Sequence, residues 1–177
     1  MKKMKRLVAV LLAGIMALAM LTACGGTGND AATAKFEASV EQAYMAKLKE
    51  KFGEEFKNFE NDADIKKLAV EHIEEMANNE TLSMDELWKK EELSEKAQNW
   101  VMICYDVNQG TGKAYVKSSY EAGKAETIET KNIDTFFSLA QMKRANVAKK
   151  AKFTALGVGA KTINGKTYVA IGFKVEG

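Results

Sequence analysis

Residues 153–162 (FTALGVGAKT) and residues 166–175 (KTYVAIGFKV) stand on either side of the pair Asn164-Gly165, and they carry the strongest structural signal in this chain. Both runs are rich in apolar and β-branched residues, as strands are. An Asn-Gly pair between two such runs is the strongest short-range indication of a two-residue hairpin turn. The sequence therefore predicts an antiparallel β-hairpin that ends the chain.

The two strands of this hairpin have one bulky side and one small side. On the small side are Gly157, Gly159, Ala170 and Gly172, which alternate with Leu156, Val158, Val169, Ile171 and Phe173. Glycine in a strand often marks the close approach of another backbone. We therefore expect a helix packed tightly against the small face. With further helices for the bulky face, the economical architecture is α+β, a three-layer α/β/α sandwich.

The helices of this sandwich are predicted by periodicity upstream of the hairpin. Apolar residues recur every four positions over residues 36–56, and again along one face of residues 65–76. Residues 61–64 (NDAD) interrupt the pattern and supply N-cap side chains for the second helix. A third helix is predicted over residues 133–150.

The middle of the chain has weaker signals. Ser83 with Glu86 three residues later is typical of a capping box, which predicts helical turns through Leu87 and Trp88. Residues 93–102 fit either a helix or a strand. Strands are expected over residues 101–107 and 113–120.

The N-terminus has the pattern of an export signal. Four cations within the first six residues precede an apolar run over residues 7–21, which closes on Leu21-Thr22-Ala23-Cys24. A cysteine after Leu-Thr-Ala resembles the lipobox of bacterial lipoproteins. That resemblance implies cleavage before Cys24 and a diacylglycerol on its thiol. The alternative is an uncleaved membrane anchor, for which residues 7–23 are short of the ~20 that a spanning helix needs.

We therefore expect residues 1–23 to be a signal peptide, residues 24–34 a flexible tether and residues 35–177 the folded domain. The chain has 26 basic and 24 acidic residues, and four of the basic residues lie in the signal. The mature chain would thus have a charge near −2, which argues against nucleic acid as a partner. The expected location is the outer face of the cytoplasmic membrane, where two acyl chains hold a protein stably.

The content of histidine and cysteine limits the chemistry. His72 is the only histidine, so one chain cannot build a multi-histidine metal centre, and we expect no metal and no cofactor. His72 shares the apolar stripe of its helix, which favours a hydrogen-bonded core histidine, with a site histidine as the alternative. Cys104 lies in the apolar run 100–105 (WVMICY), which predicts a buried and unreactive thiol.

Three segments resemble the CAP superfamily, the domain of cysteine-rich secretory proteins and antigen 5. They are residues 68–77 (LAVEHIEEMA), residues 142–147 (MKRANV) and the hairpin, in residues 153–160 and 168–173. The resemblance implies the α/β/α sandwich and a cleft. In that family the cleft carries two histidines with acidic residues, and some members bind a divalent metal there.

Mapped onto this chain, the resemblance places His72, Asp106, Asn108, Lys143 and Arg144 in the cleft. Lys143 stands where the family has its second histidine, so the usual site is not intact. Neighbouring residues on a helix point about 100° apart, and we expect Arg144 to pack while Lys143 faces the cleft. Two cations at its mouth would receive an anionic ligand group.

Together these observations predict a lipid-anchored bacterial lipoprotein that is not an enzyme and binds a lipid, a peptide or an envelope component. The ligand would be small and hydrophobic, or anionic. Two alternatives stay open: an envelope hydrolase or peptidase that uses His72, and a structural lipoprotein with a filled cleft. The sequence does not indicate an oligomeric state.

Overall fold

The computed structural model describes residues 28–79, 81–104, 106–108, 113–115, 120–121, 130 and 133–177, with side chains for residues 31–79, 81–104, 130 and 133–177. Lys35–Gly177 form one compact unit. The helices are α2 (Gly28–Phe52), the short 3-10 helix η1 (Gly53–Glu55), α3 (Ala63–Met76) and α4 (Ile133–Val147). The strands are β1 (Trp88–Ser94), β2 (Ala97–Ile103), β3 (Asp106–Asn108), β4 (Lys113–Tyr115), β5 (Tyr120–Glu121), β6 (Lys152–Ile163) and β7 (Lys166–Glu176).

The predicted C-terminal hairpin is confirmed. β6 and β7 pair in antiparallel register from Lys152 opposite Glu176 to Ile163 opposite Lys166. The two turn residues both have positive φ, 51° at Asn164 and 76° at Gly165. That is the conformation of a type I′ turn, whose twist suits a hairpin and which Asn-Gly adopts readily.

The hairpin is the centre of a mixed fold of helices and antiparallel sheet, which confirms the α+β class. The sheet has the order β1-β2-β7-β6, and β5 pairs with the first residues of β7 on the side of β2. Every pairing is antiparallel. The stretch 93–102, for which helix and strand were both open, forms the end of β1, the turn after it and most of β2.

Two other expectations for the middle of the chain need correction. Ser83 and Glu86 do exchange the two hydrogen bonds of a capping box, at 2.7 and 3.3 Å. One helical turn forms, because the amide of Leu87 donates to the carbonyl oxygen of Ser83 at 3.3 Å, but it does not continue through Trp88, where β1 begins. The strand expected over residues 101–107 is divided between β2 and β3, and of residues 113–120 the structure describes strand at Lys113–Tyr115 and Tyr120.

The small face of the sheet holds α3, as its glycines predicted. A Cβ added at Gly157 would lie 2.7 Å from the Cβ of Ile65, and one at Gly159 would lie 2.8 Å from the Cβ of Ala69. α3 is capped at its N-terminus by Asp62, whose carboxylate accepts hydrogen bonds from the amides of Asp64 and Ile65. The close approach of α3 to the sheet depends on Gly157 and Gly159, because a side chain at either position would collide with the helix.

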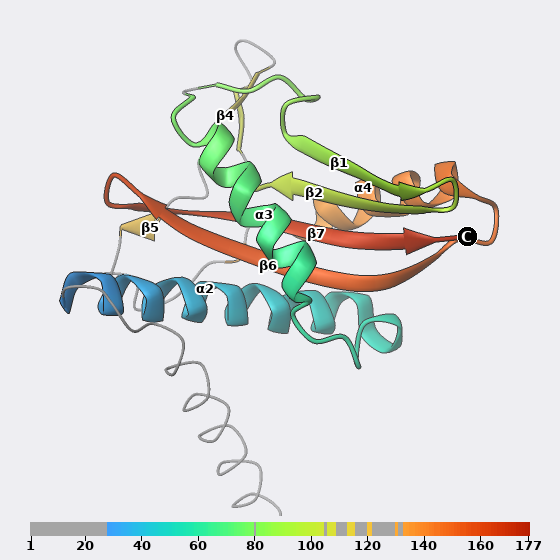
Figure 1. Cartoon of the computed structure of the whole chain (residues 1–177), viewed down its shortest axis with the longest axis horizontal. Helices are drawn as coiled ribbons and strands as arrows, with labels where there is room; N and C mark the ends of the chain where they lie inside the picture. The colour runs from blue at the N-terminus through green and yellow to red at the C-terminus, as the bar shows by residue number, and fades with distance from the viewer. Residues whose placement is uncertain are drawn as a thin grey trace, which may run out of the picture. The chain divides into compact units, whose positions relative to one another are not determined.

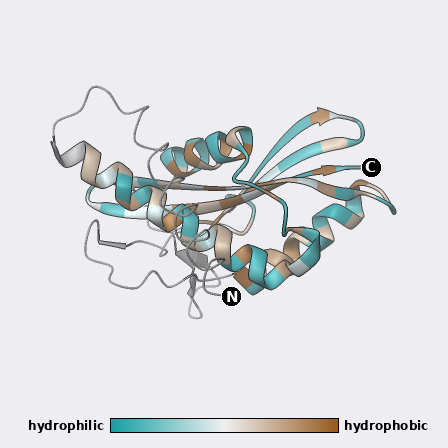
Figure 2. Cartoon of the chain, turned by 90° about the horizontal axis from the view of Figure 1, so that it is seen from below, coloured by the Kyte–Doolittle hydropathy of each residue, from teal (hydrophilic) through white to brown (hydrophobic). Residues whose placement is uncertain are grey.

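The bulky face of the sheet packs against aromatic side chains of α2 and α4. Phe173 is next to Gly172 in β7, so its side chain points to the other face. Its ring lies 5.7 Å from that of Phe136 in α4, which is 6.4 Å from that of Phe52 in α2. Figure 1 shows α3 in front of the strands and α4 behind them. Hydrophobic colour concentrates in the central strands in Figure 2, while each helix mixes both kinds of residue.

α2 also closes the free edge of β6. Glu37 and Glu41 accept hydrogen bonds from the backbone amides of Thr162 and Ala160, at 2.6 and 3.1 Å. Asn61, which precedes α3, accepts a hydrogen bond from the backbone amide of Val158 at 2.8 Å and donates one to the carbonyl oxygen of the same residue. Unpaired strand edges invite pairing with other chains, and these side chains satisfy alternate amides of this edge.

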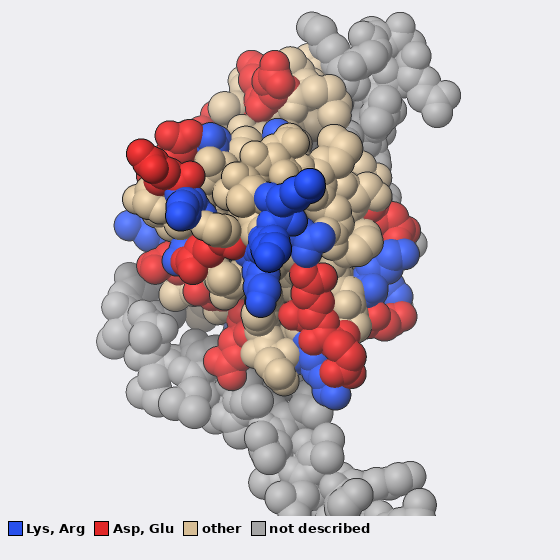
Figure 3. Space-filling view, turned by 90° about the vertical axis from the view of Figure 1, so that its right-hand side faces the viewer, with Lys and Arg blue, Asp and Glu red and all other residues tan. Residues whose placement is uncertain are grey.

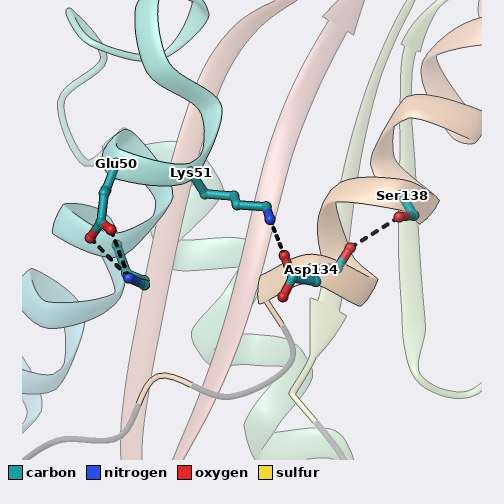
Figure 4. A network of polar contacts seen from close by, with 5 residues as sticks. Glu50, Lys51, Asp134 and Ser138 are labelled. Atoms are coloured by element: carbon teal, nitrogen blue, oxygen red, sulfur yellow. Dashed lines mark hydrogen bonds and ion pairs between the residues drawn. The ribbon is translucent and has the colours of Figure 1, made fainter.

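The helix α2 begins at Gly28, so residues 28–34, which we expected in the tether, are helical. Its far end is joined to α4 by polar contacts. Lys51 forms an ion pair with Asp134 in the first turn of α4, and Ser138 donates to the carbonyl oxygen of Asp134 at 3.1 Å (Figure 4). Among the described residues, no helix is long and apolar enough to cross a membrane.

Candidate functional site

His72 lies in the core on α3, where its side chain is 1% exposed. Its Nε2 is 3.0 Å from the carbonyl oxygen of Leu87, which also accepts the amide of Ile103. Burial lowers the pKa of the imidazole, although the carbonyl of Leu87 opposes this. The ring is therefore neutral near pH 7, with Nε2 as the donor, which is the arrangement of a core histidine.

Cys104 is also buried, as the apolar run around it predicted. Burial raises the pKa of its thiol to about 12. The thiolate is the nucleophilic form of cysteine, so this thiol is unreactive in the folded chain.

Lys143 lies on α4 with its ammonium group above two indole rings. The Nζ atom is 4.2 Å from the ring centroid of Trp100 and 5.3 Å from that of Trp88. Lys90 approaches the same Trp100 ring at 5.4 Å. Trp88 and Trp100 both belong to the aromatic face, because Trp100 stands opposite Phe173 in the register of β2 and β7. The motif comparison did not indicate this cation–π contact.

Arg144 packs against the domain, as expected from its place on the helix. Its guanidinium carbon lies 5.2 Å from the ring centroid of Phe153 and its Nη1 is 3.2 Å from a carboxylate oxygen of Glu55. The side chain is 32% exposed, so the guanidinium sits at the rim of the packed face.

The structure does not bring His72 and Lys143 together. His72 is on α3, which covers the glycine face, and Lys143 is on α4, which covers the aromatic face. The sheet therefore separates these two residues of the expected cleft. Asp106 and Asn108 belong to β3, whose side chains lie outside the described part of the chain, and Cys24 also lies outside it.

A basic concavity is present where α4 ends and β6 begins. It has a volume of about 420 Å³ and is lined by Arg144, Lys149, Lys150 and Lys152 around three alanines, Ala145, Ala148 and Ala151. The C-terminal residue Gly177 packs beside two of these alanines, because a Cβ there would lie 2.8 Å from that of Ala148 and 3.0 Å from that of Ala151. We call it the basic pocket.

Figure 3 looks onto the end of the domain where β7 finishes, and lysine and arginine side chains gather there in one patch. Within the described residues, Lys149, Lys150 and Lys152 have no acidic partner. Lys149 and Lys150 follow directly after the end of α4, where the helix dipole favours positive charge. From the sequence, Lys149 and Lys150 were expected only as the end of a helix over residues 133–150, and Lys152 had no predicted role, although the run AKKAK at residues 148–152 is visible there.

Among the residues whose side chains the structure describes, no group of three or more histidine, cysteine, aspartate or glutamate side chains could hold a metal ion. A comparison with known proteins found no matching family, no similar curated protein and no similar solved structure.

Proposed function

We propose that this chain is a bacterial lipoprotein, held at the outer face of the cytoplasmic membrane by a diacylglycerol on Cys24. Its domain is a non-catalytic binding module that captures an anionic component of the cell envelope. The anchor is argued from the four N-terminal cations, the apolar run and the Leu-Thr-Ala-Cys sequence, because this combination suits an export signal followed by lipidation.

The basic pocket is the observation that carries the binding role. Three lysines without an acidic partner among the described residues line a concavity with an apolar floor. A phosphate or carboxylate group there would meet several cations at once, and such charge-assisted contacts are the stronger hydrogen bonds. The position agrees with the expected anionic ligand near Arg144, although the cations come from the helix end rather than from a cleft with His72.

The non-catalytic role is supported by the positions of Cys104 and His72, the residues that a cysteine–histidine catalytic pair would use. Cys104 is fully buried with a raised pKa, and His72 is buried and bound to a backbone carbonyl. A cysteine–histidine pair requires the base within hydrogen-bond reach of an accessible thiol. These positions favour the binding module over the hydrolase alternative.

We also propose the finer architecture, a three-layer α/β/α sandwich of the kind that the CAP resemblance implies. Support comes from α3 on the glycine face and from α4 with the aromatic part of α2 on the other face. Membership of the CAP superfamily is part of the same proposal, and it rests on the three sequence segments.

The binding role can be tested with inorganic polyphosphate as the probe and the purified full chain in uncharged detergent. We expect saturable binding by titration calorimetry that weakens as salt is added. The variant Lys149→Gln/Lys150→Gln/Lys152→Gln should bind roughly tenfold more weakly, because three exposed cations at about 0.5 kcal/mol each give this factor.

A matched control is Lys47→Gln/Lys57→Gln/Lys67→Gln, which removes the same charge from lysines that pair with Glu50, Glu54 and Glu71 on their own helices and turns. Its affinity should stay within about twofold of that of the unchanged chain. If both triple variants lose affinity equally, the attraction is only that of overall charge, and the proposed pocket is wrong.

A further inference from the structure

The outer edge of β1 carries backbone groups that no described residue pairs. The amide of Ile103 in β2 donates to the carbonyl oxygen of Leu87, which sets the alternation of hydrogen bonds between β1 and β2. The amides and carbonyls of Lys90 and Glu92 therefore point away from β2. Among the described residues, none forms a hydrogen bond with these outward groups, and β1 is exposed over its last five residues (Figure 1).

The two edges of the sheet differ. At the β6 edge, Glu37, Glu41 and Asn61 accept hydrogen bonds from the outward amides of that strand. β1 has no such cover in the described part of the chain, and an uncovered edge is a template for pairing with another strand. Charged side chains usually prevent such pairing, because like charges that stand opposite each other are destabilising. The charges of β1 decide whether that protection applies here.

The charges of β1 are self-complementary when two copies run in opposite directions. Residues 89–92 read Lys-Lys-Glu-Glu, so an antiparallel copy of the same strand reads Glu-Glu-Lys-Lys beside it. Glu91 has no cation partner among the described residues, and its carboxylate accepts the amide of Asn99. Lys89 pairs with Glu75 of α3, but its ammonium has three donors and can contact a second carboxylate. A second copy therefore brings opposite charges together, and the protection does not apply to it.

We propose that β1 is the interface between two copies of this chain, which pair antiparallel about a twofold axis at Lys90. Lys89 of each copy then stands opposite Glu91 of the other, in a non-hydrogen-bonded pair whose Cα atoms lie about 4.5 Å apart. The two Lys90 residues meet in a hydrogen-bonded pair, where the separation is about 5.5 Å, and each also pairs with Glu92 of its own strand. A register centred on Glu91 would instead place two carboxylates at the shorter distance, so the first register is favoured.

The backbone groups fit the same register. The two Lys90 residues exchange both of their outward hydrogen bonds, and the amide of Glu92 donates to the carbonyl of Trp88 in the other copy. The amide of Trp88 already donates to the carbonyl oxygen of Asp85, so its carbonyl is the group that remains for the second copy. The pairing of β1 with β2 becomes irregular between Glu92 and Ser94, which ends the regular strand. The interface is therefore short and the dimer reversible, and it does not depend on the anionic ligand proposed above.

The test measures self-association of the full chain by sedimentation velocity in density-matched uncharged detergent. The unchanged chain should show a reversible monomer–dimer equilibrium, and a chain that stays monomeric up to about 1 mM overturns the proposal. Lys89→Glu or Glu91→Lys places like charges opposite each other, and either change should weaken the dimer at least about tenfold. An equal mixture of these two variants should dimerise as the unchanged chain does, because each supplies the charges that the other lacks.

The matched control reverses the two charges of an exposed ion pair on α2, with the variants Lys47→Glu and Glu50→Lys. These variants change the net charge by the same amounts as the variants in β1, so they report the effect of overall charge. Each should dimerise within about twofold of the unchanged chain. Equal weakening by the reversals in α2 and β1 overturns the proposal, and so does a mixture of the two β1 variants that stays monomeric.

A second pair of variants tests the backbone contact. Glu92→Pro removes an outward amide that the pairing with β2 does not use, and proline is tolerated at such positions of edge strands. Glu92→Ala keeps the amide and removes only the side chain. We expect Glu92→Pro to dimerise at least about tenfold more weakly than Glu92→Ala, because the dimer loses a hydrogen bond from each copy. Equal affinities would show that the two β1 edges do not meet. If Glu92→Pro does not fold, the charge reversals still decide the question.

Discussion

At the scale of single residues, His72 shows how burial determines the role of a titratable group. The ring has Leu87 as its hydrogen-bond partner, and Glu75 and Lys89 are the charged groups near it. Its Nδ1 lies 3.9 Å from a carboxylate oxygen of Glu75, beyond hydrogen-bond distance. The sequence left a core histidine and a site histidine open, and this environment favours the first.

A pH dependence of stability follows from this burial. The folded pKa of His72 is lowered below 6.5, so the unfolded chain binds the proton more readily. Stability from the neutral ring is therefore present above about pH 6.5 and is lost as the pH falls below it, by up to about 1.4 kcal/mol per pH unit. Denaturant unfolding of wild type and His72→Gln between about pH 5 and pH 7.5 should show this slope only in the wild type.

The titration of Glu41 changes stability with pH in the opposite direction, so this residue is the control for the experiment. Burial raises the pKa of its carboxyl above 4.5, partly offset by Lys66. The folded chain therefore binds this proton more readily, and the stability it adds is lost as the pH rises through the raised pKa. Glu41→Gln should remove that opposing slope and leave the His72 slope intact. If His72→Gln keeps the whole acid slope, His72 is not its source.

Arg144 and Lys143 make different contacts although they are adjacent. Arg144→Ala removes the ion pair with Glu55 and the contact with Phe153, and it should lower the free energy of unfolding by about 1 kcal/mol. Lys143→Ala should cost about 0.5–1 kcal/mol, because its ammonium lies over Trp88 and Trp100. Urea unfolding followed by tryptophan fluorescence would measure both changes.

Lys150→Ala serves as the comparison for both changes, since the structure describes no ring contact and no acidic partner for this exposed side chain. It should change stability by less than about 0.5 kcal/mol. If Lys143→Ala leaves the free energy of unfolding unchanged, the ammonium group is solvated rather than held over the two indole rings.

At the scale of elements, the glycine face of the hairpin can be tested by adding bulk. A Cβ at Gly172 would lie 2.6 Å from Cγ2 of Ile65 and 2.9 Å from the carbonyl oxygen of Trp100. Gly172→Val should therefore destabilise the domain by about 1–3 kcal/mol in thermal or urea unfolding, as overpacked cores do. Thr154→Val, at an exposed position of β6, should stay within about 0.5 kcal/mol. Equal melting of the two variants would show that α3 does not press on this face.

The sequence predicted those elements whose signals are local and strong. The Asn164-Gly165 turn, the glycines under α3 and the Asp62 cap each act through a few neighbouring residues, and all are present. The turn predicted after Ser83 also forms, but it does not extend through Trp88 as a helix. Its capping box forms, but Trp88 pairs with Met102 in the sheet, and that long-range partner overrides the local preference for helix.

At the scale of the whole molecule, the candidate site was less predictable than the fold. A motif places His72 and Lys143 on two helices, but only the packing shows that the sheet lies between those helices. The cations of the basic pocket can be read from the run AKKAK, whereas the concavity depends on how the end of α4 and the start of β6 are placed.

The proposed lipid anchor is testable by one substitution. Cys24→Ala removes the thiol that would carry the diacylglycerol while leaving the apolar run 7–21 unchanged. We expect the variant to lose incorporation of labelled palmitate and to accumulate as a longer precursor, measured by mass spectrometry of membrane and soluble fractions. Two acyl chains give stable membrane binding. Cys104→Ala is the control, because its buried thiol should take no label. Palmitate in Cys24→Ala, or a mature chain that starts elsewhere and still partitions into the membrane, would contradict the lipoprotein assignment.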